Sequence, residues 1–134
     1  MAEKFYLKHL KDSPDAVALR AGQLIFTQGE EGSHMFVIQE GSVEIRHNDQ
    51  LVATLTTGDI FGEMALLDHY PRSTTATTKS PCKLVPMNRE RFHELIQQAP
   101  QFATEVMQVM ADRIRLMLEN VSECNPLERK RPAE

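Results

Sequence analysis

Hydrophobic positions in the first two thirds of the chain fall into short runs separated by glycine and polar turns. Several runs alternate apolar with polar residues, which is the two-residue period of a strand with one buried face. The predicted strands cover residues 17–19, 24–26, 35–38, 43–45, 51–55 and 82–87. Many short strands with regularly spaced turn signals predict a β-sandwich or barrel.

The last third has the spacing of helices instead. Asn88 is a favourable N-cap residue, and Phe92 and Leu95 follow it at helical spacing. Pro100 ends this helix and suits the first turn of the next one, which we predict from about Gln101 to about Glu123.

These patterns predict a mainly β domain with flanking helices. We expect a single domain over residues 1–124, with β structure over about 16–87 and helices over about 88–124. A short helix is also predicted over 3–11, and a flexible tail over 125–134.

The long predicted helix carries two sets of apolar positions. The first set has the alternating four- and three-residue spacing of a heptad seam: Ala103, Met107, Met110, Ile114, Met117, Val121 and Cys124. The second set lies beside it: Phe102, Val106, Val109 and Leu116. Two apolar faces exceed what one end of a barrel needs to cover. The helix is therefore predicted to form a homodimer contact or a mobile lid, the alternative being that both faces are ordinary core.

Composition excludes several classes of protein. The apolar fraction of 41% and charged fraction of 25% are ordinary for a folded soluble domain. The net charge of −4 argues against broad attraction to nucleic acid or to a membrane surface. No apolar run is long enough to span a membrane, and the N-terminus lacks the apolar core of a signal peptide. We expect a cytoplasmic protein.

Residues for catalysis or metal binding do not form a known pattern. Cys82 and Cys124 are far apart and make no CxxC, so both are predicted as small core or interface residues. The five histidines form no HxH or HExxH pair, and GxSxG is absent. Neither an enzyme nor a metal site is expected.

The segment 58–76 carries the candidate chemistry. Glycine at position 62 lets a ligand approach the backbone closely, and residues 63–67 favour a turn or two of helix whose start attracts anions. Arg72 offers a planar donor fork for a phosphate, and Ser73 adds a hydroxyl. Glu63 would repel a phosphate, so we expect it to accept a hydrogen bond from a sugar hydroxyl instead.

The run from Phe61 to Leu67, followed by Pro71-Arg72-Ser73, resembles the phosphate-binding cassette of cyclic-nucleotide-binding domains. That family includes the regulatory subunits of cyclic-AMP-dependent kinase and the bacterial catabolite activator protein. The resemblance covers roughly residues 16–124 and implies an eight-stranded, jelly-roll-like β-roll (a double-stranded β-helix) with C-terminal helices. Four upstream glycines are interpreted as strand turns rather than ligand contacts: Gly22, Gly29, Gly32 and Gly41.

The resemblance also implies a role for each cassette residue. Backbone N–H groups of Gly62 and Ala65 would face the ligand, Glu63 would bind the ribose 2′-hydroxyl, and Arg72 and Ser73 would bind the cyclic phosphate. Thr74 stands where the family usually has alanine, a departure that would adjust affinity or ligand choice. The expected ligand-binding residues are Gly62, Glu63, Met64, Ala65, Arg72, Ser73 and Thr74.

The sequence therefore predicts a non-enzymatic receptor for cyclic AMP or cyclic GMP, with cyclic AMP favoured, that signals through its C-terminal helix. No cofactor or metal is expected beside the ligand. Expected partners are the nucleotide, a second copy of the chain and an effector protein, but not DNA or a membrane. Two alternatives remain open: a degenerate, ligand-free interaction or dimerisation module, and a sensor of another ligand on the same scaffold.

Overall fold

The computed structural model describes Leu10 and residues 13–124, with side chains up to residue 119. The helix predicted over 3–11 lies outside the described residues except for Leu10, which is helical and buried, and so does the tail predicted over 125–134. The strands are β1 (Val17–Leu19), β2 (Leu24–Phe26), β3 (His34–Glu40), β4 (Ser42–His47), β5 (Gln50–Thr56), β6 (Ile60–Phe61), β7 (Thr75–Thr78) and β8 (Cys82–Asn88). The helices are α2 (Met64–Leu67), α3 (Arg89–Gln98) and α4 (Gln101–Cys124).

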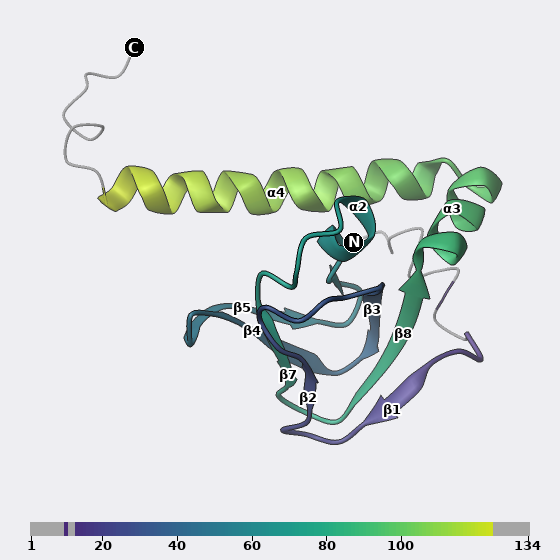
Figure 1. The fold of residues 1–134 in the computed structure, drawn as a ribbon, viewed down its shortest axis with the longest axis horizontal. Coiled ribbons are helices and arrows are strands. Elements are labelled where there is room, and N and C mark those ends of the chain that lie inside the picture. The colour runs from purple at the N-terminus through teal and green to yellow at the C-terminus, as the bar shows by residue number, and fades with distance from the viewer. Residues whose placement is uncertain (1–9, 11–12, 125–134) are drawn as a thin grey trace, which may run out of the picture.

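The strands form two four-stranded antiparallel sheets (Figure 1). One sheet has the order β1-β8-β3-β6, with Val37 opposite Val85 in its centre. The other has the order β2-β7-β4-β5, with Ile45 opposite Ala76. All six predicted strands are present, and the prediction of a mainly β fold with C-terminal helices is confirmed.

Two strands were missed by the sequence pattern, and both lie in the segment 58–76. β6 has only two residues, too few to display a period, and pairs Phe61 with Phe36 of β3. β7 buries Ala76 and Thr78 on one face, so its run of threonines has a period of two that hydrophobicity alone does not reveal. Threonine favours strands because its branched side chain packs well on a pleated surface.

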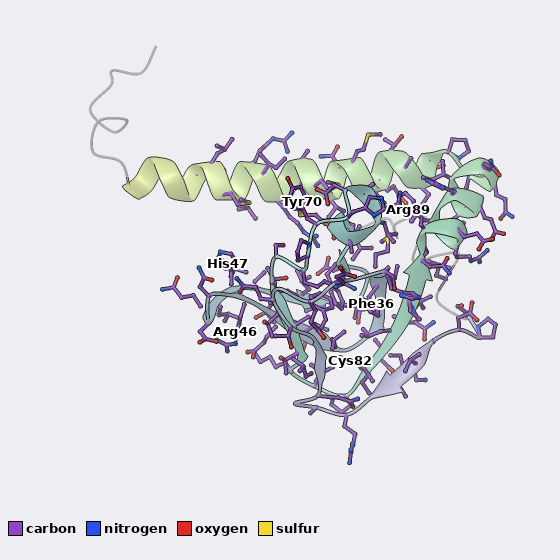
Figure 2. The ribbon with its side chains drawn as sticks, viewed as in Figure 1. Phe36, Arg46, His47, Tyr70, Cys82 and Arg89 are labelled. Carbon is purple, nitrogen blue, oxygen red and sulfur yellow. The ribbon has the colours of Figure 1, made fainter. Side chains whose placement is uncertain are left out.

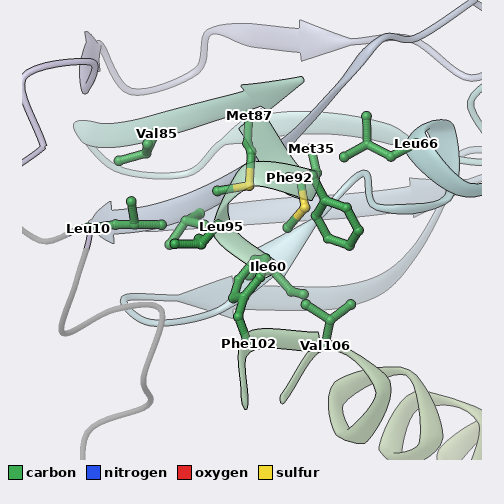
Figure 3. Close-up of a cluster of buried hydrophobic side chains, with 11 residues drawn as sticks. Leu10, Met35, Ile60, Leu66, Val85, Met87, Phe92, Leu95, Phe102 and Val106 are labelled. Atoms are coloured by element: carbon green, nitrogen blue, oxygen red, sulfur yellow. The ribbon is translucent and has the colours of Figure 1, made fainter. Parts of the chain in front are cut away.

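The core has two parts. One cluster fills the β-roll between the sheets: Phe26, Ile38, Val43, Ile45, Phe61, Ala76, Cys82 and Leu84. The other seals the end of the roll beneath the helices and includes Met35 and Met87 of the strands, Phe92 and Leu95 of α3, and Phe102 of α4 (Figure 3). The burial of Cys82 confirms that it is a small core residue.

The helix boundaries follow the predicted capping residues. Asn88 accepts a hydrogen bond from the N–H of Arg91 at 2.8 Å, which confirms it as the N-cap of α3. Pro100 separates α3 from α4, as predicted. α4 then crosses the end of the β-roll and lies over α2 (Figure 1), so the last helix is brought to the cassette. Among the described residues, no helix is both long and apolar enough to cross a lipid bilayer.

The environment of the apolar positions changes along α4, because Leu116 of the second set is exposed and Met110 of the seam packs against the core. Phe102 and Val106 are buried in the core, and Val109 and Met110 pack partly against it. Three seam residues are exposed instead: Met107 (61%), Ile114 (54%) and Met117 (64%). The alternative that both faces are ordinary core is therefore wrong for the described part of α4. The side chains of Val121 and Cys124 lie outside the described residues.

Candidate functional site

Two backbone hydrogen bonds fix the position of Arg72. Its N–H donates to the carbonyl of Glu30 at 2.7 Å, and its carbonyl accepts from the N–H of Gly29 at 2.8 Å. The loop after α2 is thereby tied to the turn between β2 and β3. This pairing directs the arginine side chain into the roll, where only 8% of the residue remains exposed.

The guanidinium of Arg72 is held by carbonyl oxygens and an aromatic ring. Nη2 donates to the carbonyl of His34 at 2.8 Å, and Nη1 donates to the carbonyl of Gly62 at 3.2 Å. Cζ lies 4.0 Å from the centroid of the Phe26 ring. Nε is buried and has no hydrogen-bond partner among the described residues. One donor of a buried cation is therefore unsatisfied.

Burial lowers the pKa of Arg72 below its ordinary value, because removal from water disfavours the charged form. The nearby carboxylates of Glu30 and, to a smaller extent, Glu63 raise this pKa, because their negative charge favours the charged guanidinium. Among the described residues, none of the ion pairs includes Arg72. The guanidinium is thus a desolvated cation that pairs with no carboxylate among the described residues.

Two glycines make room for this guanidinium. A Cβ at Gly32 would lie 2.3 Å from Nε of Arg72, and a Cβ at Gly62 would lie 2.7 Å from Nη1. Gly62 also has a φ of +78°, a backbone conformation that residues with a side chain rarely adopt. Gly32 has a role beside the predicted turn, because its lack of a side chain makes room for the arginine. Gly22, Gly29 and Gly41 have positive φ, as expected for turns.

Glu63 occupies the N-cap position of α2 and is 6% exposed. Its Oε1 accepts from Nη1 of Arg113 at 2.7 Å, and Arg113 also donates to the carbonyl of Ile60. Arg113 belongs to α4, so the last helix is bonded directly to the cassette. Sequence reasoning missed Arg113, because no local motif links two residues so far apart. The signal available was a cation one residue before the seam position Ile114.

The other predicted residues differ in exposure. Ala65 is buried, and its N–H donates to the Gly62 carbonyl at 3.3 Å. Met64 is exposed, Thr74 is half-buried, and Ser73 is exposed with its carbonyl 2.8 Å from Nδ1 of His47.

Further labelled side chains are distributed around the cassette (Figure 2). Figure 2 shows Phe36 inside the roll, His47 on the β4–β5 hairpin and Tyr70 on the loop after α2. His69, in the cassette loop, has Nε2 3.3 Å from Nη2 of Arg89, so its ring faces α3.

The arrangement provides a buried cation, a neutralised carboxylate and a glycine-lined backbone within one short segment. Arginine presents five N–H donors and suits phosphate oxygens, whereas a carboxylate accepts hydrogen bonds from hydroxyl groups. Arg72 and Glu63 both lie beside Gly62, which joins β6 to α2. This set of donors and acceptors suits a molecule that carries both a phosphate and a hydroxyl group.

Comparison with known proteins gives consistent matches. Residues 16–99, more than half of the chain, match the family described as the cyclic nucleotide-binding domain. The chain is 32% identical over 98 residues to a cAMP-dependent protein kinase regulatory subunit of Schizosaccharomyces pombe. The matching segment covers 72% of this chain and 24% of that protein. It is 28% identical over 107 residues to a CRP-like cAMP-activated global transcriptional regulator of Mycobacterium tuberculosis. The matching segment covers 76% of this chain and 48% of that protein.

The fold is similar to that of the Thermus thermophilus catabolite activator protein in its crystal structure. The TM-score is 0.74 at 29% identity, over 88% of this chain and 60% of that one. This chain thus spans from about a quarter to a little under two thirds of the length of these proteins. The matching segment contains both the β-roll and the cassette, and the chain therefore belongs to the cyclic nucleotide-binding domain family.

Proposed function

We propose that the chain is a non-enzymatic receptor domain that binds a 3′,5′-cyclic nucleotide, with cyclic AMP favoured over cyclic GMP. The observation that carries the proposal is the guanidinium of Arg72, which is buried, bonded to two carbonyls and left with an unsatisfied Nε. A buried cation is costly unless an anion accompanies it, and a cyclic phosphate supplies that anion. The preference for cyclic AMP is supported by the names of the two relatives.

The proposed contacts follow the family resemblance residue by residue. Arg72 and Ser73 bind the phosphate, backbone N–H groups of Gly62 and Ala65 face it, and Glu63 accepts from the ribose 2′-hydroxyl. Because the Ala65 N–H donates to the Gly62 carbonyl in this structure, ligand binding requires it to exchange that partner. Met64 and Thr74 are proposed to border the ligand.

Arg113 explains how a carboxylate can lie so close to a phosphate site. Glu63 is nearly buried and would repel an anion, but its charge is offset by Arg113 at 2.7 Å. A carboxylate has acceptor sites for more than one donor, so a ribose hydroxyl can join Arg113 on Glu63. We include Arg113 in the site as the residue that keeps Glu63 compatible with an anionic ligand.

The same ion pair supports signalling through α4. Phe102 and Val106 anchor the start of the helix in the core, whereas its later seam residues are exposed. The ion pair between Arg113 and Glu63 therefore ties the middle of α4 to the proposed ligand site. A ligand that bonds to Glu63 changes the environment of Arg113 and so the stability of the docked helix.

A second candidate function is self-association through α4. It is favoured by the exposed seam residues Met107, Ile114 and Met117, which recur at seven- and three-residue spacing on a helix that crosses the roll. In this proposal the occupant of the seam is the same helix of a second copy. The two functions are compatible, because the seam residues are exposed while Arg113 is bonded to the cassette.

Titration calorimetry with cyclic AMP, cyclic GMP and 5′-AMP tests the proposed function. We expect saturable binding of a cyclic nucleotide and weaker binding of 5′-AMP, whose phosphate carries an additional charge and is not closed into a ring. Absence of binding by both cyclic nucleotides at millimolar concentration would contradict the proposal. It would leave self-association as the function that the structure supports.

A further inference from the structure

Three aromatic rings pack together beneath the cassette arginine. Phe26 lies 6.1 Å from Phe36 and 5.9 Å from Phe61, and Phe36 lies 5.2 Å from Phe61, measured between ring centroids. Arg72 is the cation associated with this group. Its Cζ is 4.0 Å from the centroid of Phe26 and 5.9 Å from that of Phe36. Phe26 is therefore the ring in closest contact with the guanidinium.

The contact with Phe26 attracts the cation of Arg72 without using its N–H donors. Among the described residues, Arg72 forms no ion pair, and its side-chain hydrogen bonds go to backbone carbonyls. The face of an aromatic ring attracts a cation without forming hydrogen bonds, so it leaves the N–H donors of the guanidinium unused. A carboxylate at the same place would consume donors and would repel a phosphate.

Stacking also restricts the orientation of the guanidinium. The ring of Phe26 lies against it, and Gly32 comes so close to Nε and Cζ that a methyl group would not fit. Phe26 is itself fixed, since it is 7% exposed and belongs to the core cluster between the sheets. The plane of the guanidinium, and with it the direction of the unsatisfied Nε–H, is thereby set before a ligand arrives.

We infer that Phe26 is a positioning residue for anion binding: its ring holds the guanidinium of Arg72 in the plane that offers Nε–H to a phosphate. The inference rests on the proposed function for the identity of the ligand, but not for the contact itself. Phe26 does not touch the phosphate and acts through Arg72. Weakening the cation–π contact should therefore lower affinity for the nucleotide by about 2- to 30-fold, without unfolding the protein.

The ligand-free protein gives the first test. Aromatic rings shift the NMR signals of protons above their faces upfield, so the guanidinium N–H signals of Arg72 should lie upfield of those of exposed arginines. In Phe26→Leu they should move to the ordinary arginine position. Phe92→Leu is the matched control, because Phe92 is also 7% exposed but packs against Phe102 in the other cluster. Arg72 signals that are unshifted in the wild type, or unaffected by Phe26→Leu, would overturn the inference.

Binding gives the second test, with changes too small to disturb packing. Phenylalanine analogues carrying one, two and three ring fluorines are placed at position 26, and in parallel at position 92. Fluorine weakens the negative face of the ring while nearly preserving its shape, so affinity should fall stepwise at position 26 only. Equal losses at both positions, no loss, or a gain at position 26 would overturn the inference. If the wild type binds no cyclic nucleotide, the proposed function fails, and the NMR result alone decides the role of Phe26.

Discussion

Nη1 of Arg113 lies 2.7 Å from Oε1 of Glu63, and this ion pair joins α4 to the start of α2. The two residues are fifty positions apart in the sequence. Glu63 is almost fully buried and Arg113 is about two-thirds buried, so water screens the pair less than it screens a surface salt bridge. The residue proposed to recognise the ribose is thus the residue that holds the middle of the last helix.

Replacing Arg113 by glutamine should weaken nucleotide binding and loosen α4. The substitution leaves the Glu63 carboxylate uncompensated beside the phosphate, and losing one partner of a buried charge pair costs about 2–5 kcal/mol. We expect at least a tenfold loss of affinity and faster hydrogen exchange in the second half of α4. Arg115→Gln is the control on the same helix, because Arg115 is 65% exposed and pairs with Asp112, one turn earlier. Similar effects from both variants would show that Arg113 acts through general charge alone.

Gly32→Ala should reduce affinity much more than stability. The backbone at Gly32 does not have the positive φ that excludes side chains, so the protein can fold with alanine there. The new Cβ would, however, lie 2.3 Å from Nε of Arg72 and would force the guanidinium from its place. We expect a tenfold or larger loss of nucleotide affinity in calorimetry. The fall in melting temperature should be smaller than that of Gly22→Ala, whose Cβ meets no atom within 4 Å but whose φ of +76° strains an alanine. Unchanged affinity would mean that the position of the guanidinium is not critical.

The double substitution of Ile114 and Met117 by aspartate should abolish self-association. Both side chains are exposed seam residues on α4, so charge placed there opposes the docking of a second helix with little effect on the fold. Sedimentation velocity should show a dimer for the wild type and a monomer for the variant. Thr104→Asp, which changes an exposed residue of α4 outside the seam, should remain dimeric. A wild-type protein that is monomeric at all concentrations would contradict the self-association proposal.

The sequence allowed most of the fold to be predicted because its strands and helices obey simple periods. Glycine and polar turns separated the strands, and Asn88 and Pro100 marked the ends of the helices. Two strands were not predicted, each for a physical reason. Ile60–Phe61 is too short to show a period, and in Thr75–Thr78 threonines occupy both buried and partly buried positions, so hydrophobicity does not alternate. The fold was thus predictable wherever hydrophobicity alone reported which face is buried.

The candidate site was predictable only where it is local in sequence. Glu63 and Arg72 belong to one recognisable segment, and the structure brings both to Gly62. The partners that set their chemistry come from distant elements: Phe26 from β2, Gly32 from the next loop and Arg113 from α4. Such contacts depend on how the sheets close and where the last helix docks. No period or short motif in the sequence specifies them.

Calorimetric titration of the wild type and of Arg72→Ala with cyclic AMP tests the central proposal most directly. Removing the guanidinium would leave the phosphate without its buried partner, at a cost of about 2–5 kcal/mol, or about thirty-fold or more in affinity. Arg91→Ala, which removes an exposed arginine of α3, should bind as the wild type does. The account predicts saturable binding by the wild type and by Arg91→Ala, and strongly weakened binding by Arg72→Ala. Equal affinities for wild type and Arg72→Ala, or no binding by the wild type at millimolar nucleotide, would contradict it.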